Sequence, residues 1–326
     1  MRVHANDGIS AQAQAAFKEQ GFTITVNFVP QEELVAFINK EKVEALLVRS
    51  ATKVRKDLID ACPGLKLIGR GGVGMDNIDV AYARGKGIRV VNTPASSSIS
   101  VAELVMAHLF GLVRDLYKAN RRMCVEGHDA AAFKEMKKSY GKGAELRGKT
   151  LGIVGFGRIG KWVARYAIGN GMKVVYYDRS ATADHLEVQF NGDTVRIGVK
   201  MVPMEELLHS CDAISLHVPA TEDGAPLLGA QEFAQMKKGM LVINTARGNS
   251  IDEEELLKAL NSGTVKAAAL DVFENEPTPR ADLLAHPNVS LSPHIGAATM
   301  EAQERIGDEL VELLVAFRDE VTVGRG

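Results

Sequence analysis

Residues 151–160 read Leu-Gly-Ile-Val-Gly-Phe-Gly-Arg-Ile-Gly, and this stretch decides the fold of the second half of the chain. Leu151–Val154 is a short apolar run of the kind that forms a buried parallel strand. Gly155, Gly157 and Gly160 follow in the spacing G-x-G-x-x-G, which is typical of a tight turn that opens a helix. The pattern predicts a Rossmann βαβ unit that binds a dinucleotide.

The turn and the next strand supply separate parts of that binding site. Gly157 lets the backbone approach a pyrophosphate, and the amides of the helix start at Arg158 and Ile159 favour its negative charge. Asp178 ends the next strand-like run, where an acid accepts hydrogen bonds from ribose hydroxyls and repels a 2′-phosphate. We therefore expect NAD rather than NADP, with Arg179 as a neighbour that would tolerate a phosphate.

Outward from this unit, short apolar runs alternate with amphipathic segments in both halves of the chain. This alternation favours two doubly wound α/β domains with parallel sheets. In the first half we expect strands at Thr23–Val29, Ala45–Val48, Leu65–Gly69 and Ile88–Val91 and helices at Ala11–Gln20, Gln31–Lys40, Lys56–Ala61 and Ile78–Gly85. In the second half we expect strands at Thr150–Val154, Lys173–Tyr177, Ala213–His217, Leu241–Asn244 and Lys266–Leu270.

The domain boundary is expected near residues 92–98, where Pro94 and three serines end a strand and precede a long helix. A final amphipathic helix, Thr299–Phe317, would return the chain to the first domain. We therefore expect a substrate-binding domain of residues 1–97 and 297–326 and a dinucleotide domain of residues 98–296.

Two segments depart from the regular alternation. A basic stretch at about 118–148 has few strand signals and is a candidate dimerisation arm, with a surface loop on a monomer as the alternative. Residues 187–197 predict a β-hairpin around an Asn191-Gly192 turn. Because the hairpin follows Asp178, we expect an insertion on the adenine side of the cofactor, of open function.

Composition excludes several classes of protein. The 326 residues carry a net charge of −2, without the basic field of a nucleic-acid-binding protein. No apolar run reaches the roughly 18 residues of a membrane span. The three cysteines, Cys62, Cys124 and Cys211, cannot all pair and suit a reducing compartment, so we expect a cytoplasmic protein. No metal site is predicted.

Three polar residues beyond the glycine-rich turn suggest catalysis. Arg247 follows a strand-like run, where ligands of open α/β sheets bind, and a guanidinium there can hold a substrate carboxylate. His294 follows the run Val289–Leu291, and its imidazole suits the proton transfer that accompanies carbonyl reduction. Glu276 is the acid that would orient the imidazole. A surface salt bridge, a structural histidine and a solvated acid are the respective alternatives.

In these motifs the chain resembles the D-2-hydroxyacid dehydrogenase family. The motifs follow the order G-x-G-x-x-G, Asn-Thr-Ala-Arg-Gly from Asn244, Asp-Val-Phe-x-x-Glu-Pro from Asp271 and Ser-Pro-His-x-Gly from Ser292. The resemblance implies flavodoxin-like and Rossmann-like domains, NAD between them and a homodimer joined through the NAD-binding domains. It implies that Arg247 binds substrate, that Glu276 pairs with His294 and that His294 is the acid/base.

The resemblance also assigns binding residues. It places cofactor contacts at Gly155, Gly157, Arg158, Ile159, Gly160, Asp178, Val73, Val218, Thr245, Ala246, Asp271, Gly296 and Ala297. Val73 and Val218 stand where relatives often have threonine, so that only backbone contacts are expected there. Substrate contacts are implied at Arg49, Ser50, Lys53, Gly72, Val73, Gly74, Arg247 and His294.

The stretches Val48–Val54 and Gly69–Asp79 resemble the branch of the family that acts on a phosphorylated substrate. Arg49, Lys53, Arg55 and Lys56 cluster where a helix begins, and a bound anion would relieve cations at that position. The expected reaction is NAD-dependent oxidation of 3-phospho-D-glycerate to 3-phosphohydroxypyruvate in serine synthesis. A hydroxypyruvate or glyoxylate reductase is the nearest alternative, and a non-enzymatic NAD-sensing module is a remote one.

Overall fold

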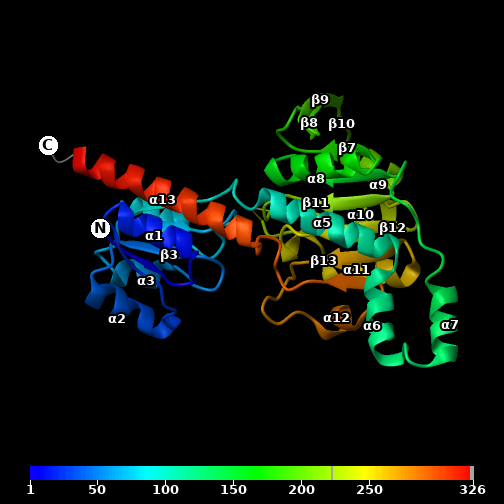
Figure 1. The fold of residues 1–326 in the computed structure, drawn as a ribbon, viewed down its shortest axis with the longest axis horizontal. Helices are drawn as coiled ribbons and strands as arrows, with labels where there is room; N and C mark the ends of the chain where they lie inside the picture. Colours follow the sequence, from blue (N-terminus) through cyan, green and yellow to red (C-terminus); the bar gives the residue numbers. More distant parts are fainter. Residues whose placement is uncertain (222, 324–326) are drawn as a thin grey trace. The chain divides into compact units, whose positions relative to one another are not determined.

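The computed structural model describes residues 1–221 and 223–323 and divides the chain into two compact units. The first unit contains Met1–Ser98 and Ala297–Gly326, and the second contains Ile99–Gly296. The first boundary therefore lies one residue later than the sequence suggests. Both units are α/β structures built on parallel sheets, as the alternation of apolar and amphipathic segments predicted (Figure 1).

The first unit is built on a five-stranded parallel sheet of order β2-β1-β3-β4-β5, the flavodoxin-like order. Its strands are β1 (Arg2–Ala5), β2 (Thr23–Thr25), β3 (Ala45–Val48), β4 (Leu67–Arg70) and β5 (Arg89–Asn92). The sequence analysis did not predict β1, which lies inside the sheet. The buried His4 of β1 is accommodated because its ring is hydrogen-bonded to the Thr25 hydroxyl, 2.9 Å away, and to the Asn6 side chain, 3.0 Å away.

The prediction of a strand over Thr23–Val29 was too long, because β2 ends at Thr25. Beyond that point the side chain of Asn6 takes the place of a neighbouring strand. Its amide oxygen accepts from the Val29 N–H at 2.9 Å, and its amide nitrogen donates to the Val29 carbonyl at 3.1 Å. A single side chain thus satisfies the backbone that a longer strand would have paired.

Helices cover both faces of this sheet. Its helices are α1 (Ala11–Glu19), α2 (Gln31–Glu41), α3 (Lys56–Ala61), α4 (Val80–Gly85) and α13 (Met300–Val323). Ala45 and Leu47 of β3 pack with α1 and α13, whereas Leu46 and Val48 pack with α2, α3 and α4. The apolar residues of β3 therefore face opposite sides, as expected of a strand buried on both faces. Figure 1 shows α13 beside α1, so the C-terminal helix completes this unit.

The second unit is built on a seven-stranded parallel sheet of order β10-β7-β6-β11-β12-β13-β14. Its strands are β6 (Thr150–Val154), β7 (Lys173–Tyr177), β10 (Lys200–Met201), β11 (Ala213–Leu216), β12 (Met240–Asn244), β13 (Val265–Leu270) and β14 (Val289–Leu291). Five of them lie where the sequence predicted strands, and β14 coincides with the apolar run before His294. The order reverses beside β6, which is where doubly wound sheets bind their ligands.

The helices of this unit form two layers. The helices on the sheet are α5 (Ser98–Val113), α8 (Arg158–Gly169), α9 (Met204–Ser210), α10 (Ala230–Gln235), α11 (Glu253–Ser262) and α12 (Ala281–Ala285), with a 3-10 turn η1 (Gly248–Ser250). One apolar core includes residues of α5 and α8, and the other includes residues of α9, α10 and α11.

Of the two irregular segments, the hairpin takes the form that the sequence predicted, whereas the basic stretch, for which no secondary structure was predicted, is helical. Residues from the basic stretch form α6 (Leu116–Glu126) and α7 (Ala130–Ser139), which lie side by side (Figure 1). Arg122 joins them by an ion pair to Glu135 at 2.8 Å. The predicted hairpin is β8 (His185–Phe190) paired antiparallel with β9 (Asp193–Gly198). Asn191 and Gly192 both have positive φ, which confirms the tight turn.

Candidate active site

The predicted site residues of the second unit lie at one edge of its sheet. Each follows the carboxyl end of a parallel strand, where ligands of doubly wound sheets bind. Gly155 follows β6, Asp178 follows β7, Val218 follows β11, Thr245–Arg247 follow β12, Asp271 follows β13 and His294 follows β14. The fold therefore gathers residues that are far apart in the sequence.

The glycine-rich turn is closely packed on one side and open on the other. A Cβ atom on Gly155 would lie 2.4 Å from the His217 carbonyl oxygen, and one on Gly160 would lie 2.1 Å from the Gly155 carbonyl oxygen. A Cβ atom on Gly157 would meet no atom within 4 Å. Gly157 is also the N-cap of α8, and no side chain caps the first amides of the helix there. The turn thus offers free backbone to a phosphate while fixing strand to helix.

Asp178 is fixed against this turn by backbone amides. One carboxylate oxygen accepts from the Phe156 N–H at 2.6 Å, and the other accepts from the N–H groups of Ser180 and Ala181, both at 2.8 Å. Partial burial opposes the charged form, but these hydrogen bonds prevail and hold the pKa of Asp178 below its ordinary value. The carboxylate therefore carries its charge in a fixed position beside the glycine-rich turn.

Thr245 provides an independent test of whether a cofactor fits this edge. Its hydroxyl is buried and has no hydrogen-bond partner within the described part of the chain. Buried hydroxyls are normally satisfied, so an unpartnered one at the end of β12 suits a ligand atom that the protein alone does not provide. The open side of Gly157 and the unpartnered Thr245 hydroxyl both fit a bound dinucleotide.

Glu276 and His294 are brought together, as the sequence analysis expected from the resemblance. One Glu276 carboxylate oxygen lies 2.7 Å from Nδ1 of His294, and the other accepts from the Phe273 N–H at 3.0 Å. The His294 side chain is 44% exposed, so its second ring nitrogen remains accessible. A cavity of about 410 Å³ adjoins the pair and has apolar walls formed by Phe273, Pro277, Pro279, Leu284, Leu291 and Pro293.

Asp271 holds the segment that carries His294. Its carboxylate accepts from the Ser292 hydroxyl at 2.6 Å and from the backbone amides of Ile295 and Gly296 at 2.9 and 2.8 Å. His294 has φ of +55°, a conformation uncommon for a residue with a side chain. Hydrogen bonds on both sides of it compensate this strain, so Asp271 has a structural task in addition to the cofactor contact expected for it.

Arg247 follows β12 in a rigid turn. The Asn244 side chain donates to the Arg247 carbonyl at 2.8 Å and accepts from the Ala246 N–H at 3.0 Å. A Cβ atom on Gly248 would lie 1.9 Å from the Phe273 carbonyl oxygen. The segment with Arg247 is therefore packed directly against the turn that leads to Glu276.

The predicted substrate residues of the first unit come from two loops that Asn77 joins. Its side-chain amide donates to the carbonyl oxygens of Arg49 and Thr52, at 2.8 and 2.6 Å. The loop of Gly72–Gly74 is held by the Thr93 hydroxyl, which accepts from the Gly72 N–H at 2.7 Å, and by Asn92, which donates to the Val73 carbonyl. Ser50, Lys53 and Val73 are exposed, and Arg49 is half-buried.

The four cations of the basic cluster, residues 49, 53, 55 and 56, differ in their interactions. Arg55 forms an ion pair with Asp79 at 3.0 Å, and the Lys56 ammonium lies 5.4 Å from the centre of the Tyr82 ring. Among the described residues, the Arg49 guanidinium has neither a hydrogen bond nor an ion pair. Burial lowers the pKa of Arg49, an effect that Asp7 partly opposes. Arg49 and Lys53, rather than all four cations, remain available to an anion.

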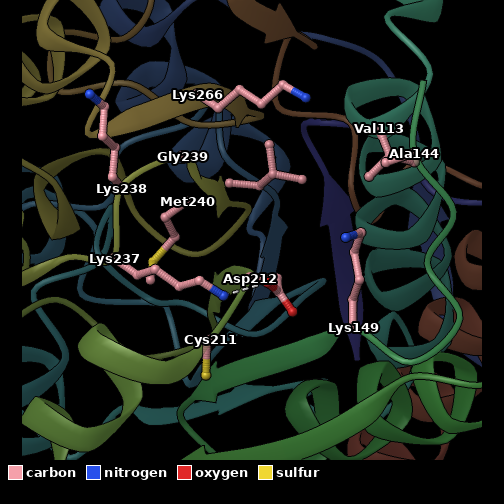
Figure 2. Close-up of a pocket in the computed structure, with 11 residues that line it drawn as sticks. Val113, Ala144, Lys149, Cys211, Asp212, Lys237, Lys238, Gly239, Met240 and Lys266 are labelled. Atoms are coloured by element: carbon pink, nitrogen blue, oxygen red, sulfur yellow. Dashed lines mark hydrogen bonds and ion pairs between the residues drawn. The ribbon is translucent and has the colours of Figure 1, made fainter. Parts of the chain in front are cut away.

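A second hollow of the NAD-binding unit, residues 99–296, lies at the opposite edge of its sheet. Its cavity of about 110 Å³ lies near the amino-terminal ends of the strands. Figure 2 shows the side chains that line it, which include Lys149, Lys266 and the ion pair of Lys237 with Asp212. None of the predicted site residues lines it. Its position separates it from the edge that carries Gly155, Arg247 and His294.

Sequence reasoning missed several residues that support the site. His108 of α5 contacts the hydroxyls of Ser290 and Ser292 at 3.2 and 3.0 Å, and thereby supports the strand that leads to His294. Asn77 and Thr93 order the loops of the first unit. The sequence shows His108 within an apolar helix and Asn77 within a glycine-rich loop. It does not show the residues that they contact, because these lie far away along the chain.

Over residues 1–221 and 223–323, His, Cys, Asp and Glu side chains do not gather in threes that would hold a metal ion. Over the same residues, no helix combines the length and the apolar character needed to cross a membrane.

Comparison with known families identifies the second unit. Residues 106–296 match the model of the D-isomer specific 2-hydroxyacid dehydrogenase, NAD binding domain. This match covers more than half of the chain and includes the glycine-rich turn, Arg247, Glu276 and His294.

Individual relatives extend the likeness to nearly the whole chain. A hydroxypyruvate reductase of Thermotoga maritima is 43% identical over 317 residues, covering 95% of this chain and 96% of the relative. A D-3-phosphoglycerate dehydrogenase of Archaeoglobus fulgidus is 40% identical and covers 97% of this chain, which spans only 57% of that relative's length. The solved structure of the TT0316 protein from Thermus thermophilus has a TM-score of 0.83 at 33% identity, with 97% of each chain covered.

Proposed function

The chain belongs to the family of D-isomer specific 2-hydroxyacid dehydrogenases, and from this premise we propose that it oxidises 3-phospho-D-glycerate to 3-phosphohydroxypyruvate, the first step of serine synthesis. The family is NAD-dependent, and its reaction is the reversible oxidation of a D-2-hydroxy acid. The observation that carries the catalytic part is the Glu276–His294 pair at the same sheet edge as the glycine-rich turn.

We assign proton transfer to His294. Because Glu276 binds Nδ1, the exposed Nε2 is the nitrogen that takes the proton of the substrate hydroxyl during oxidation and returns it during reduction. The Glu276 carboxylate stabilises the imidazolium and fixes the ring orientation. Arg247 holds the substrate carboxylate by paired hydrogen bonds and polarises the C2 oxygen.

We assign the cofactor to the edge formed by Gly155–Gly160, Asp178 and Thr245. When bound, NAD supplies the acceptor for the hydride that leaves C2 of the hydroxy acid. The free amides at the start of α8 would bind its pyrophosphate, and the fixed charge of Asp178 would bind its ribose hydroxyls.

The phosphate of the substrate is assigned to Arg49 and Lys53. The half-buried Arg49 guanidinium forms neither a hydrogen bond nor an ion pair with the described residues, so Asp7 compensates its lost hydration only in part. A phosphate supplies two or more charge-assisted hydrogen bonds to such a group. This argument favours a phosphorylated substrate over an unphosphorylated hydroxy acid.

Hydroxypyruvate reduction is the second candidate, because the Thermotoga maritima relative bears that name and matches this chain over nearly the full length of both. Both reactions use the same acid/base and carboxylate-binding residues and differ in the phosphate. A non-catalytic NAD-sensing module is a remote third candidate, and measurable turnover with either substrate excludes it.

We also propose that the protein is a homodimer joined through its NAD-binding domains. The surface of α5, α6 and α7 exposes Phe110, Leu116, Met123, Val125 and Phe133. Exposed apolar side chains that recur on neighbouring helices favour a protein interface. A sedimentation-velocity measurement that gives twice the mass of the chain would support this proposal. The free thiols of Cys62, Cys124 and Cys211 support a cytoplasmic location.

The substrate assignment is tested by kcat/KM for NADH oxidation with 3-phosphohydroxypyruvate and with hydroxypyruvate. A charge-assisted phosphate site should give a preference on the order of 10²-fold for the phosphorylated substrate. Arg49→Ala should remove most of that preference, whereas Arg55→Gln, at a cation already paired with Asp79, should retain it. Parity between the substrates in the wild-type enzyme would assign the protein to the reductases.

A further inference from the structure

Glu253 and Glu274 are joined by two reciprocal hydrogen bonds. Glu253 is the first residue of α11, and Glu274 lies in the turn between β13 and Glu276. The Glu253 carboxylate accepts from the Glu274 N–H at 3.0 Å, and the Glu274 carboxylate accepts from the Glu253 N–H at 3.0 Å. The two side chains thus connect α11 to the turn that carries Glu276.

Helix capping does not account for this buried carboxyl group. The Asp252 side chain already caps α11 by accepting from the Glu255 N–H at 3.0 Å, and Glu254 and Glu255 place further negative charge in the first turn. Glu253 is nevertheless only 2% exposed, and its second oxygen has no hydrogen-bond partner within the described residues. Burial raises the pKa of Glu253. A buried acid with this environment needs another role.

The contacts of the turn point to that role. Phe273 and Glu274 provide two consecutive backbone amides, of which the first donates to Glu276 and the second to Glu253. Gly248 approaches the other side of the same peptide so closely that a Cβ atom there would lie 2.0 Å from the Phe273 carbonyl carbon. The Phe273–Glu274 peptide, which directly follows the amide that binds Glu276, is therefore fixed between the segment after Arg247 and the carboxyl group of Glu253.

We propose that Glu253 is a positioning residue for the Glu276–His294 pair. It touches neither member of the pair, but it holds the Phe273–Glu274 peptide, and through the α-carbon of Phe273 it limits the orientation of the preceding peptide, whose N–H binds the Glu276 carboxylate. The proposal rests on the acid/base role assigned above to His294. A displacement of about 1 Å at reacting groups can reduce turnover by roughly 10²-fold, so the placement of this peptide has kinetic consequences.

The test compares three variants by steady-state reduction of 3-phosphohydroxypyruvate and of hydroxypyruvate. Glu253→Met keeps a side chain of similar length but removes the acceptor, and should lower kcat about tenfold or more while leaving KM and NADH affinity unchanged. Glu253→Gln keeps a carbonyl oxygen for the Glu274 N–H and should restore turnover. Glu254→Gln, at the exposed neighbour that pairs with Lys258, is the matched control.

Combining Glu253→Met with Glu276→Gln separates positioning from general stability. If Glu253 acts through Glu276, its replacement should have little further effect once Glu276 is changed, whereas independent effects would multiply. Wild-type kcat in Glu253→Met, equal losses in the Met and Gln variants, or multiplying effects would each overturn the proposal.

If Glu253→Met does not fold, Glu274→Ala provides the test. This variant removes the hydrogen bond from the Glu253 N–H to the Glu274 carboxylate, and the Glu274 side chain is exposed. A reduced kcat at unchanged KM then supports the proposal, and a wild-type kcat overturns it. The proposed function fails separately, if His294→Asn retains full turnover.

Discussion

Gly160 lies so close to the carbonyl oxygen of Gly155 that a Cβ atom on Gly160 would lie only 2.1 Å from that oxygen. Both groups belong to the backbone, which cannot move aside as the end of a flexible side chain could. The approach of helix α8 to strand β6 therefore depends on the absence of a single carbon atom.

Gly160→Ala should weaken both folding and NADH binding, because the start of α8 must shift away from β6. We expect a loss of about 1–3 kcal/mol in the free energy of unfolding, measured by urea denaturation, and a clear rise in the NADH dissociation constant. Gly169→Ala is the control, since a Cβ atom at the end of the same helix meets no atom within 4 Å. Equal stability of the two variants would contradict the packing argument.

The contact between Glu276 and His294 leads to a kinetic prediction. Glu276→Gln keeps a polar side chain beside Nδ1 but removes the charge that stabilises the imidazolium. Turnover should fall, by about 10²-fold or more, and NADH binding followed by fluorescence should remain unchanged. A variant that retains wild-type turnover would show that the 2.7 Å contact is structural.

Much of this arrangement followed from the sequence because local patterns determine it. Gly155–Gly160 and the apolar runs around it predicted the strand, the turn and the helix of the Rossmann unit. Asn191-Gly192 predicted a hairpin that the structure confirms. In each case the relevant interactions lie within a few residues of one another, which a linear pattern can reveal.

Other features escaped the sequence analysis because they depend on partners far along the chain. Strand β1 was missed because the polar residue His4 is satisfied by Thr25, which lies on the neighbouring strand. Glu253 reads as one of three acids at a helix start, and only the fold places it against Glu274. The basic cluster after β3 gave no indication that Asp79 would neutralise Arg55.

The fixed carboxylate of Asp178 predicts the choice of cofactor. Asp178→Ser removes the charge that would repel a 2′-phosphate, and Arg179 stands next to it. We expect the ratio of kcat/KM for NADPH to that for NADH to rise by about tenfold or more. An electrostatic free-energy difference of about 1.4 kcal/mol between the two cofactors corresponds to a factor of ten. Asp184→Asn, at an exposed acid in the same loop, should leave the ratio unchanged.

The environments of the cysteines predict selective modification. Burial raises the pKa values of Cys62 and Cys211 to about 11, so both remain protonated thiols at neutral pH. Cys124 on α6 is exposed. Native protein should therefore react with one equivalent of a thiol reagent at pH 7.5 and unfolded protein with three, as counted by mass spectrometry. Rapid modification of Cys62 or Cys211 in the native protein would contradict their burial.

Three histidines predict how stability depends on pH. Burial lowers the pKa values of His4, His108 and His217, the last to about 3, so the folded protein keeps these rings neutral below the ordinary value of 6.5. The unfolded chain binds protons there. Their contribution to stability is therefore complete above pH 6.5 and lost as pH falls from 6.5 toward the folded values. Each ring should remove up to about 1.4 kcal/mol of the free energy of unfolding per pH unit in that window.

Urea denaturation between pH 7.5 and 5 measures this dependence of stability on pH, and His108→Gln should reduce its slope. A free energy of unfolding that stays constant or rises on acidification would contradict neutral, buried rings.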